Sequence, residues 1–214
     1  MTTITMIISL LFSEPTLFLI WILAITYGIT VHEFAHVFAA FLQGDDTGRL
    51  MGRLTLNPIA HLDPMGSLLL LVVGFGWGRP APFNPHNLKY RRWGEFFVSI
   101  AGLVANLISI IIFGILGGVL INVLGGSNLL IQFLISLVYI NIILLIFNLL
   151  PIPPLDGSKI LFEILPDKYS HLKSSLEKNG PWILLFLIFS DLILGIDVFG
   201  GIRLISTKVI ELFF

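Results

Sequence analysis

The pentapeptide HEFAH at residues 32–36 combines two histidines four positions apart with a glutamate beside the first. On an α-helix, residues four apart share a face, so His32 and His36 can bind one metal ion. Glu33 is close enough to accept a proton from a water bound to that metal. This pattern indicates metal-dependent hydrolysis.

The motif lies in an apolar run from Thr16 to Leu42. At about 1.5 Å per residue, a helix of this length exceeds the roughly 30 Å hydrocarbon core of a bilayer. Ionisable side chains are costly inside a membrane-spanning helix and usually indicate function there. This cost argues against the alternative that His32 and His36 only pack between helices.

A catalytic zinc ion usually has three protein ligands. Asp156 is a candidate third ligand because it follows a run of prolines, where the backbone is stiff, and precedes Gly157, where the chain can turn sharply. It could instead cap a helix that begins at Gly157. His61 and Asp63 are rival candidates, so these residues alone do not decide which side chain is the third ligand. The two other histidines resemble solvated loop residues: His86 and His171.

The composition indicates a membrane protein. Of the 214 residues, 56% are hydrophobic and 12% are charged, against about 25% charged in soluble domains. The net charge of -1 gives no reason to expect a nucleic-acid partner. Because the chain has no cysteine, a metal site must use histidine, aspartate or glutamate.

Further apolar runs set the number of spans. Trp93–Leu124 and Leu129–Leu150 are long enough to cross a bilayer. After Pro181, the run Trp182–Ile196 is short for a span. The amphipathic stretch Val198–Phe214 is either a surface helix or a further span. We therefore expect an all-α polytopic membrane protein with about four to six transmembrane helices.

The whole chain, residues 1–214, is predicted to form a single membrane-embedded domain, with a core over about residues 16–160 and C-terminal helices over 181–214. The apolar core of Gly66–Gly78 is too short to cross, so a re-entrant segment near the site is expected there. Arg49–Leu56 alternates in polarity and predicts a short extended pair. Residues 151–180 are expected to form a loop.

Basic residues predict the orientation. They gather in the loops after the first and third long spans, and the turn between the second and third spans has none. The positive-inside rule places both loops in the cytoplasm of a multi-pass protein of the cell membrane. His32, His36 and Asp156 then lie at similar depth, toward the cytoplasmic side. The basic residues of these two loops are Arg49, Arg53, Arg79, Lys89, Arg91, Arg92, Lys159, Lys168, Lys173 and Lys178.

Small residues on the second span indicate a surface for close helix packing. Gly114 and Gly118 follow the small-xxx-small pattern. That pattern favours close helix packing, within one chain or between two chains. A homo-oligomer therefore stays open.

Three separated motifs carry a resemblance. HEFAH in an apolar helix, AGLVAN in a later one and NLLPIPPLDG at the end of a third resemble the site-2 protease family of intramembrane zinc metalloproteases. The loop phrases LNPIAHLDPMG and GWGRPAPFNPHNL are similar to its small branch, which lacks PDZ and CBS domains. The similarity covers roughly residues 25–160.

The resemblance implies a function and a set of roles. The family cleaves peptide bonds within or near transmembrane helices, so the implied partners are transmembrane protein substrates in the lipid bilayer. His32, His36 and Asp156 would bind one Zn²⁺ per chain. Glu33 would be the general base, and Asn148 would help to hold the substrate or the developing oxyanion. Asn106 lies in AGLVAN, where the family more often has proline after the glycine and this chain has leucine.

Two other functions fit a membrane metal site. A metal-binding or transport protein would use Glu33 as a structural carboxylate, but transporters usually have more spans, often as repeats, and this sequence shows no repeat. A catalytically inactive protease homologue is the second alternative. The presence of all four residues of the proposed site argues against it: His32, Glu33, His36 and Asp156.

Overall fold

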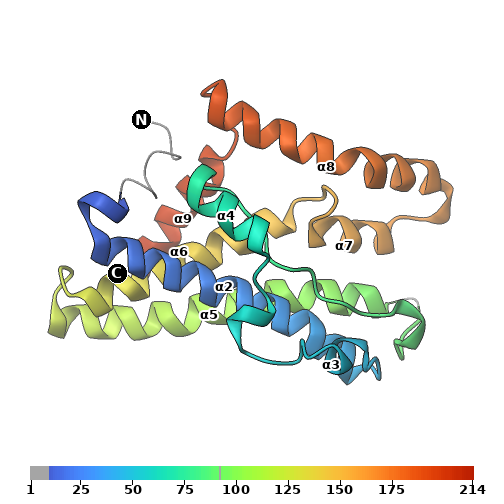
Figure 1. Ribbon diagram of the computed structural model, residues 1–214, viewed down its shortest axis with the longest axis horizontal. Coiled ribbons are helices and arrows are strands. Elements are labelled where there is room, and N and C mark those ends of the chain that lie inside the picture. Colours follow the sequence, from blue (N-terminus) through green and yellow to red (C-terminus); the bar gives the residue numbers. More distant parts are fainter. Residues whose placement is uncertain (1–9, 92) are drawn as a thin grey trace.

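Three long helices form the centre of the molecule (Figure 1). The computed structural model describes residues 10–91 and 93–214. Within these residues, α2 (Pro15–Leu42), α5 (Gly94–Leu124) and α6 (Leu129–Leu149) are long and apolar enough to cross a membrane. The protein is thus a multi-pass, all-helical membrane protein, and the prediction of four to six spans is not confirmed.

Neighbouring helices alternate in direction, so α5 runs opposite to α2 and α6 (Figure 1). Their shared core is apolar and contains Ala24, Ile131 and Leu134. The outer face of α5 is apolar as well, with exposed Ile112 and Ile115. A helix that is apolar both inside and outside is expected where lipid replaces water as the solvent.

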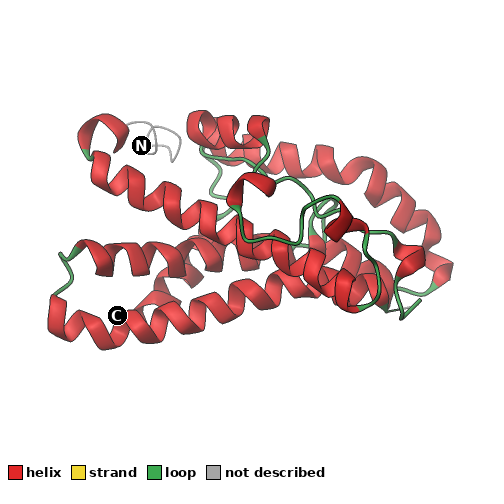
Figure 2. Ribbon diagram, turned by 60° about the horizontal axis from the view of Figure 1, so that its bottom comes forward, coloured by secondary structure: helices red, strands yellow, loops and turns green. Residues whose placement is uncertain are grey.

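The connection from α2 to α5 starts at the end of the bundle opposite the α5–α6 turn and reaches back along α2, where Leu70 packs against the core that contains Ala24 and Ile25 (Figure 1 and Figure 2). The described part of this connection contains four short helices, and an isolated antiparallel bridge pairs Leu62 with Gly78. These helices are α3 (Thr47–Leu50), η1 (Pro58–Ala60), α4 (Pro64–Val73) and η2 (Pro85–Asn87).

The extended pair predicted over Arg49–Leu56 is wrong. Thr47–Leu50 is helical, and the chain then turns at Gly52, whose φ is 70°. Asp45 accepts hydrogen bonds from the amide and the hydroxyl of Thr47, at 3.2 and 2.6 Å. These local hydrogen bonds favour a turn over a strand, despite the alternating polarity.

The segment Gly66–Gly78 doubles back on itself. Helix α4 ends at Gly74, which has the left-handed conformation. The returning chain lies so close to α4 that a Cβ at Gly66 would lie 2.2 Å from the carbonyl oxygen of Trp77. This course agrees with a re-entrant segment in shape, and its depth in the membrane stays a prediction.

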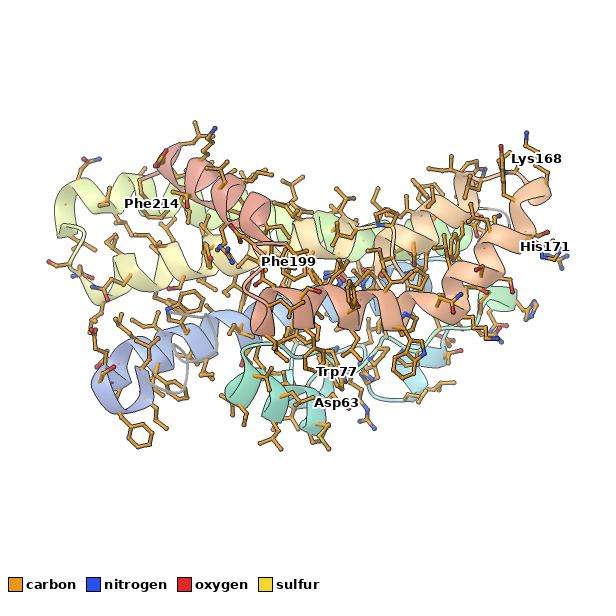
Figure 3. The ribbon with its side chains drawn as sticks, turned by 90° about the horizontal axis from the view of Figure 1, so that it is seen from above. Asp63, Trp77, Lys168, His171, Phe199 and Phe214 are labelled. Carbon is orange, nitrogen blue, oxygen red and sulfur yellow. The ribbon has the colours of Figure 1, made fainter. Side chains whose placement is uncertain are left out.

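The loop predicted over residues 151–180 is wrong. The segment contains α7 (Asp156–Ile164), η3 (Asp167–Tyr169) and the first half of α8 (Ser170–Ile193). Pro181 lies inside α8 and does not begin a separate run. Packing explains why the helix continues through it, because Leu184 and Ile188 of α8 pack against Leu155. At the outer end of this region, Lys168 and His171 lie away from the bundle (Figure 3).

The amphipathic stretch at residues 198–214 forms α9 (Gly200–Glu211), whose 12 residues are too few to cross a bilayer. The chain then packs against α5. A Cβ at Gly114 would lie 2.7 Å from the ring of Phe213, and one at Gly117 would lie 2.3 Å from the ring of Phe214. The small-residue stripe of α5 therefore receives phenylalanines of the same chain. Arg92, counted above among the basic residues, lies outside the described residues.

Candidate metal centre

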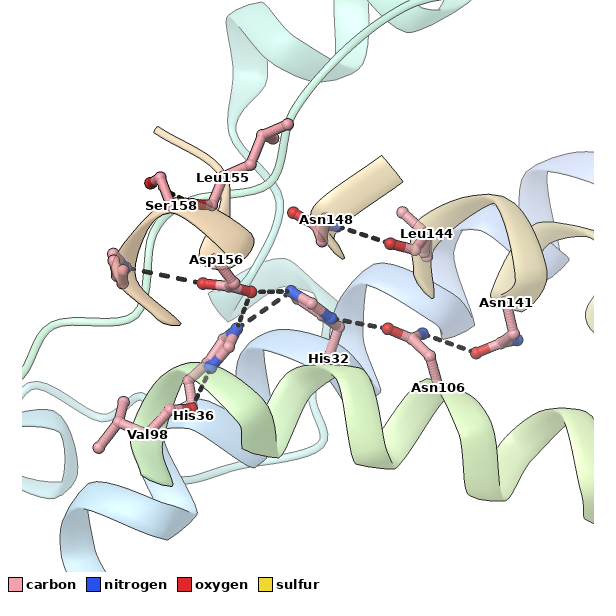
Figure 4. Close-up of polar contacts among 11 residues, drawn as sticks. His32, His36, Val98, Asn106, Asn141, Leu144, Asn148, Leu155, Asp156 and Ser158 are labelled. Carbon is pink, nitrogen blue, oxygen red and sulfur yellow. Dashed lines mark hydrogen bonds and ion pairs between the residues drawn. The ribbon is translucent and has the colours of Figure 1, made fainter. Parts of the chain in front are cut away.

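Three buried side chains converge where α2 meets the start of α7 (Figure 4). His32 Nε2 lies 3.1 Å and His36 Nε2 3.0 Å from Asp156 Oδ2. The two Nε2 atoms are 3.0 Å apart. All three residues are at most 6% exposed. Segments 120 residues apart in the sequence thus form one compact cluster.

Helix α5 orients both imidazoles. His36 Nδ1 donates to the carbonyl oxygen of Val98 at 2.7 Å, because a carbonyl can only accept. His32 Nδ1 lies 2.7 Å from Asn106 Oδ1, an oxygen that likewise accepts. With both Nδ1 atoms protonated, the Nε2 atoms carry lone pairs that face Asp156. A partner on the other ring nitrogen is the usual support of a histidine metal ligand.

The residues fit a metal ion. Two Nε2 lone pairs and a carboxylate oxygen face one another, and Asp156 Oδ2 is buried without a hydrogen-bond donor. Three acceptors in such contact repel unless a cation lies among them. Zinc binds such atoms at about 2.0–2.2 Å, which sets tetrahedral ligand atoms about 3.3 Å apart, close to the 3.0–3.1 Å seen here.

The support of His32 extends through the bundle. Asn106 Nδ2 donates to Asn141 Oδ1 at 2.8 Å, and Asn141 Nδ2 donates to the carbonyl oxygen of Leu137 at 2.8 Å. Both asparagines are 0% exposed. This chain of hydrogen bonds connects α2 through α5 to α6 at the level of the metal centre.

Gly102 provides the space for the two imidazoles. A Cβ at this position would lie 2.5 Å from His36 Nε2 and 2.6 Å from His32 Cε1. No real Cβ approaches another atom so closely, so a larger residue would displace the histidines or move α5 away. Close packing thus requires glycine here.

Asp156 is the first residue of α7, and the capping position is Leu155. The structure therefore does not place Asp156 as the helix cap considered above. A Cβ at Gly157 would lie 2.2 Å from the carbonyl oxygen of Leu149, so this glycine lets α7 begin directly against the end of α6. Lys159 Nζ lies 3.6 Å from Asp156 Oδ1, on the side away from the histidines.

Glu33 and Asn148 flank the cluster. The half-buried Glu33 faces the returning chain after α4, where a Cβ at Gly78 would lie 3.5 Å from Glu33 Oε1. Asn148 lies in the last turn of α6 and donates to the carbonyl oxygen of Leu144 at 3.0 Å (Figure 4). Glu33 thus lies against the main chain at Gly78, and the side-chain amide of Asn148 is hydrogen-bonded within its own helix.

The rival ligands have other partners. His61 is 0% exposed and donates through Nε2 to the carbonyl oxygen of Thr55 at 2.6 Å. Asp63 caps α4 by accepting from the amide of Gly66 at 2.8 Å. Neither belongs to the cluster of His32, His36 and Asp156. The remaining histidines are exposed, as expected of solvated residues: His86 and His171.

The motif around Asn106 departs from the family pattern and does not predict a site role for it, yet its side chain accepts the hydrogen bond that orients His32. The signal that could have found it is an amide inside an apolar span, and the same holds for Asn141. No side-chain signal could reveal the carbonyl of Val98 or the space at Gly102, because both depend on how α5 packs against α2.

The loop beside the site is anchored at a buried carboxylate. Asp45 is 1% exposed, and besides its bonds to Thr47 it accepts from the amide of Asn84 at 2.8 Å and from Asn87 Nδ2 at 3.0 Å. Burial alone would raise the pKa of Asp45, but these hydrogen bonds hold it below its ordinary value. Asp45 thereby fastens the end of α2 to the segment that precedes α5.

A largely apolar cavity of about 930 Å³ lies between α2, α4, α6 and the α8–α9 region, which contributes Asp191 and Arg203 to its lining. Ile29 lines it one helical turn before Glu33, and Phe147 lines it next to Asn148. A volume of this size lies at the upper end of ligand pockets in proteins, about 300–1,000 Å³. The cavity is therefore lined by neighbours of Glu33 and Asn148 on the same helices, and not by these two residues themselves.

The chain is similar to known proteins. The model of the family described as peptidase family M50 matches residues 123–190. The protein YwhC of Bacillus subtilis, provisionally named a zinc metalloprotease, is 41% identical over 177 residues, which cover 80% of each chain. Rip2 of Mycolicibacterium smegmatis, also provisionally named a zinc metalloprotease, is 33% identical over 135 residues, 60% of this chain and 51% of Rip2. No solved structure matched.

Proposed function

The chain belongs to peptidase family M50, the site-2 protease family, and from this premise we propose that this membrane zinc metalloprotease cleaves peptide bonds within or near the transmembrane helices of its substrates. The observation that carries the proposal is the buried convergence of His32, His36 and Asp156 between apolar helices. A site at this depth can act on bonds that a soluble protease does not reach.

His32, His36 and Asp156 would hold the zinc ion. Bound there, zinc supplies Lewis-acid polarisation of the scissile carbonyl and lowers the pKa of water. The protein residues provide the remaining functions. Val98 and Asn106 keep both Nε2 atoms available, and Gly102 gives the imidazoles room. Burial excludes competing water from the ligands.

Glu33 acts as the general base in this proposal. Its carboxylate takes a proton from the attacking water and later delivers it to the leaving amide nitrogen, so one group serves both halves of the reaction. Asn148 would donate to the developing oxyanion. Because Nδ2 now bonds to Leu144 within α6, Asn148 would use its second amide hydrogen or turn away from the helix.

The substrate segment must unwind locally, because helical hydrogen bonds protect its backbone. Residues 75–82, the part of the 66–82 segment that follows α4, are the proposed partner strand, since Gly78 is already extended enough to pair with Leu62. The apolar cavity beside Ile29 and Phe147 could receive side chains next to the scissile bond. We expect helix-weakening residues near the cut to favour cleavage, and equally fast cleavage of an all-leucine helix would contradict this.

The setting is proposed as well. The protein would form a single catalytic domain, residues 1–214, in the cell membrane with the metal centre toward the cytoplasm, where its basic loops lie. The substrates and the lipid bilayer are its expected partners, and no feature favours a nucleic acid. Accessibility labelling of Lys89 and of Asn128, each replaced by cysteine in intact cells, would test this orientation because they flank opposite ends of α5.

The deciding experiment measures zinc content and cleavage of a model transmembrane substrate by the purified protein. Glu33→Gln should keep about one zinc per chain and lose at least about 100-fold in cleavage rate, because it removes the base and leaves the ligands. Glu14→Gln, at the other end of α2, is the matched control and should cleave normally. Cleavage by Glu33→Gln at the wild-type rate would disprove the mechanism, and zinc binding without any wild-type cleavage would favour a metal-binding or inactive protein.

A further inference from the structure

Arg53 is a buried cation in the loop between α3 and η1. Only 6% of it is exposed, and its Nη2 donates to the carbonyl oxygen of Arg79 at 2.6 Å. Its Nε is buried and has no hydrogen-bond partner. A buried charge is costly unless an opposite charge lies near it, so the position of Arg53 calls for a physical reason.

The carboxylate of Glu33 is one opposite charge that acts on Arg53. Burial lowers the pKa of the Arg53 guanidinium, the negative charge of Glu33 acts in the opposite direction, and the positive charge of Arg79 lowers the pKa further. Arginine stays protonated in proteins. Its positive charge is therefore held where it attracts Glu33.

The hydrogen bond from Arg53 also fixes the main chain of Gly78 and Arg79, the wall that Glu33 faces. Its acceptor, Arg79, directly follows Gly78, the residue beside Glu33 Oε1. The amide of Arg79 donates to the carbonyl oxygen of His61 at 2.7 Å. This wall is thus held from two sides, by the Arg53 side chain and by the main chain of the buried His61.

We infer that Arg53 is a positioning residue for Glu33. Its hydrogen bond to the carbonyl oxygen of Arg79 fixes the Gly78–Arg79 main chain against which the Glu33 carboxylate lies, and this packing restricts the orientation of the carboxylate. The inference rests on the proposed role of Glu33 as the base. Arg53 would not touch the substrate, and its contribution would be to the rate of proton transfer and not to substrate affinity.

The test compares Arg53→Met with Arg53→Lys in the full-length protein. Arg53→Met should keep the zinc content and hold KM within about twofold, while kcat falls about 10- to 100-fold because the base is no longer held in place. Arg53→Lys keeps the charge without the planar fork of donors, so it should recover part of kcat. Arg49→Met is the matched control, because this arginine lies in α3, just before the loop that holds Arg53, but is exposed and paired with Asp46.

Each outcome decides the inference. Wild-type kcat in Arg53→Met overturns it, and so does a loss of zinc in both variants, which would show a structural role only. If Arg53→Met does not fold, Arg53→Lys is compared with wild type in the same way: kcat should fall while KM stays nearly constant. A wild-type kcat in Arg53→Lys would then overturn the inference. If wild type and Arg49→Met both fail to cleave, the proposed function falls and takes the inference with it. Wild-type cleavage with unaffected Arg53→Met overturns the inference alone.

Discussion

Asn106→Leu tests whether the metal centre depends on its support from α5. The substitution keeps a buried side chain of similar size and removes the oxygen that lies 2.7 Å from His32 Nδ1. A buried N–H without an acceptor costs about 1–3 kcal/mol. The imidazole can avoid that cost by moving its proton to Nε2, where the proton blocks metal binding, or by turning the ring.

Both responses weaken the bound state. Loss of such a partner lowers metal affinity about 10- to 100-fold, which corresponds to about 1.4–2.7 kcal/mol. This range agrees with the cost of the unsatisfied N–H. The substitution also leaves Asn141 Oδ1 without its donor at 2.8 Å, so the unfolding temperature should fall as well.

The assay is competition for zinc between the purified protein and a chelator of known affinity. Asn141→Leu should lower zinc affinity less than Asn106→Leu, because His32 keeps its acceptor. Asn122→Leu, an exposed amide on the same helix, should leave the affinity unchanged. The reasoning is refuted if Asn106→Leu binds zinc as tightly as wild type, or if Asn141→Leu is the more damaging change.

Three further results are expected. Gly102→Ala places a methyl group 2.5 Å from an imidazole nitrogen, so zinc occupancy and cleavage should both fall more than about tenfold, and normal metal analysis would contradict the predicted clash. Asp156→Ala should lower zinc occupancy, and unchanged occupancy would send the search to His61 or Asp63. The folded pKa of Asp45 lies below its ordinary value of 3.8, so its stabilising effect is complete above about pH 4 and is lost as pH falls further. Thermal unfolding in detergent from pH 6 to 3 should show this loss in wild type and less of it in Asp45→Asn, and equal profiles would count against the anchor.

Local spacing explains why part of the site was predictable. His32 and His36 share a helix, so their separation follows from the helix itself. The place of Asp156 in the site depends on a contact between segments far apart in the sequence. Its preceding prolines, the basic loops that set its depth and the family resemblance indicated it as a ligand. The three long spans matched their predicted bounds within two residues, because lipid imposes a continuous apolar length on each.

The errors arose where packing outweighed local preference. The proline at position 181 predicts the start of a separate apolar run, but contacts of Leu184 and Ile188 keep α8 continuous through it. Arg49–Leu56 alternates in polarity like a strand, yet the buried carboxylate of Asp45 stabilises a turn at its start. Such contacts involve partners that a window of sequence does not contain.

The glycine stripe of α5 has a consequence for self-association. Phe213 and Phe214 already fill the surface at Gly114 and Gly117. A second copy that offered a helix to this stripe would first have to displace both aromatic rings. Pairing of two copies through α5 would therefore replace a contact within one chain by a contact between chains. The C-terminal phenylalanines of the chain would compete with the second copy for the same surface.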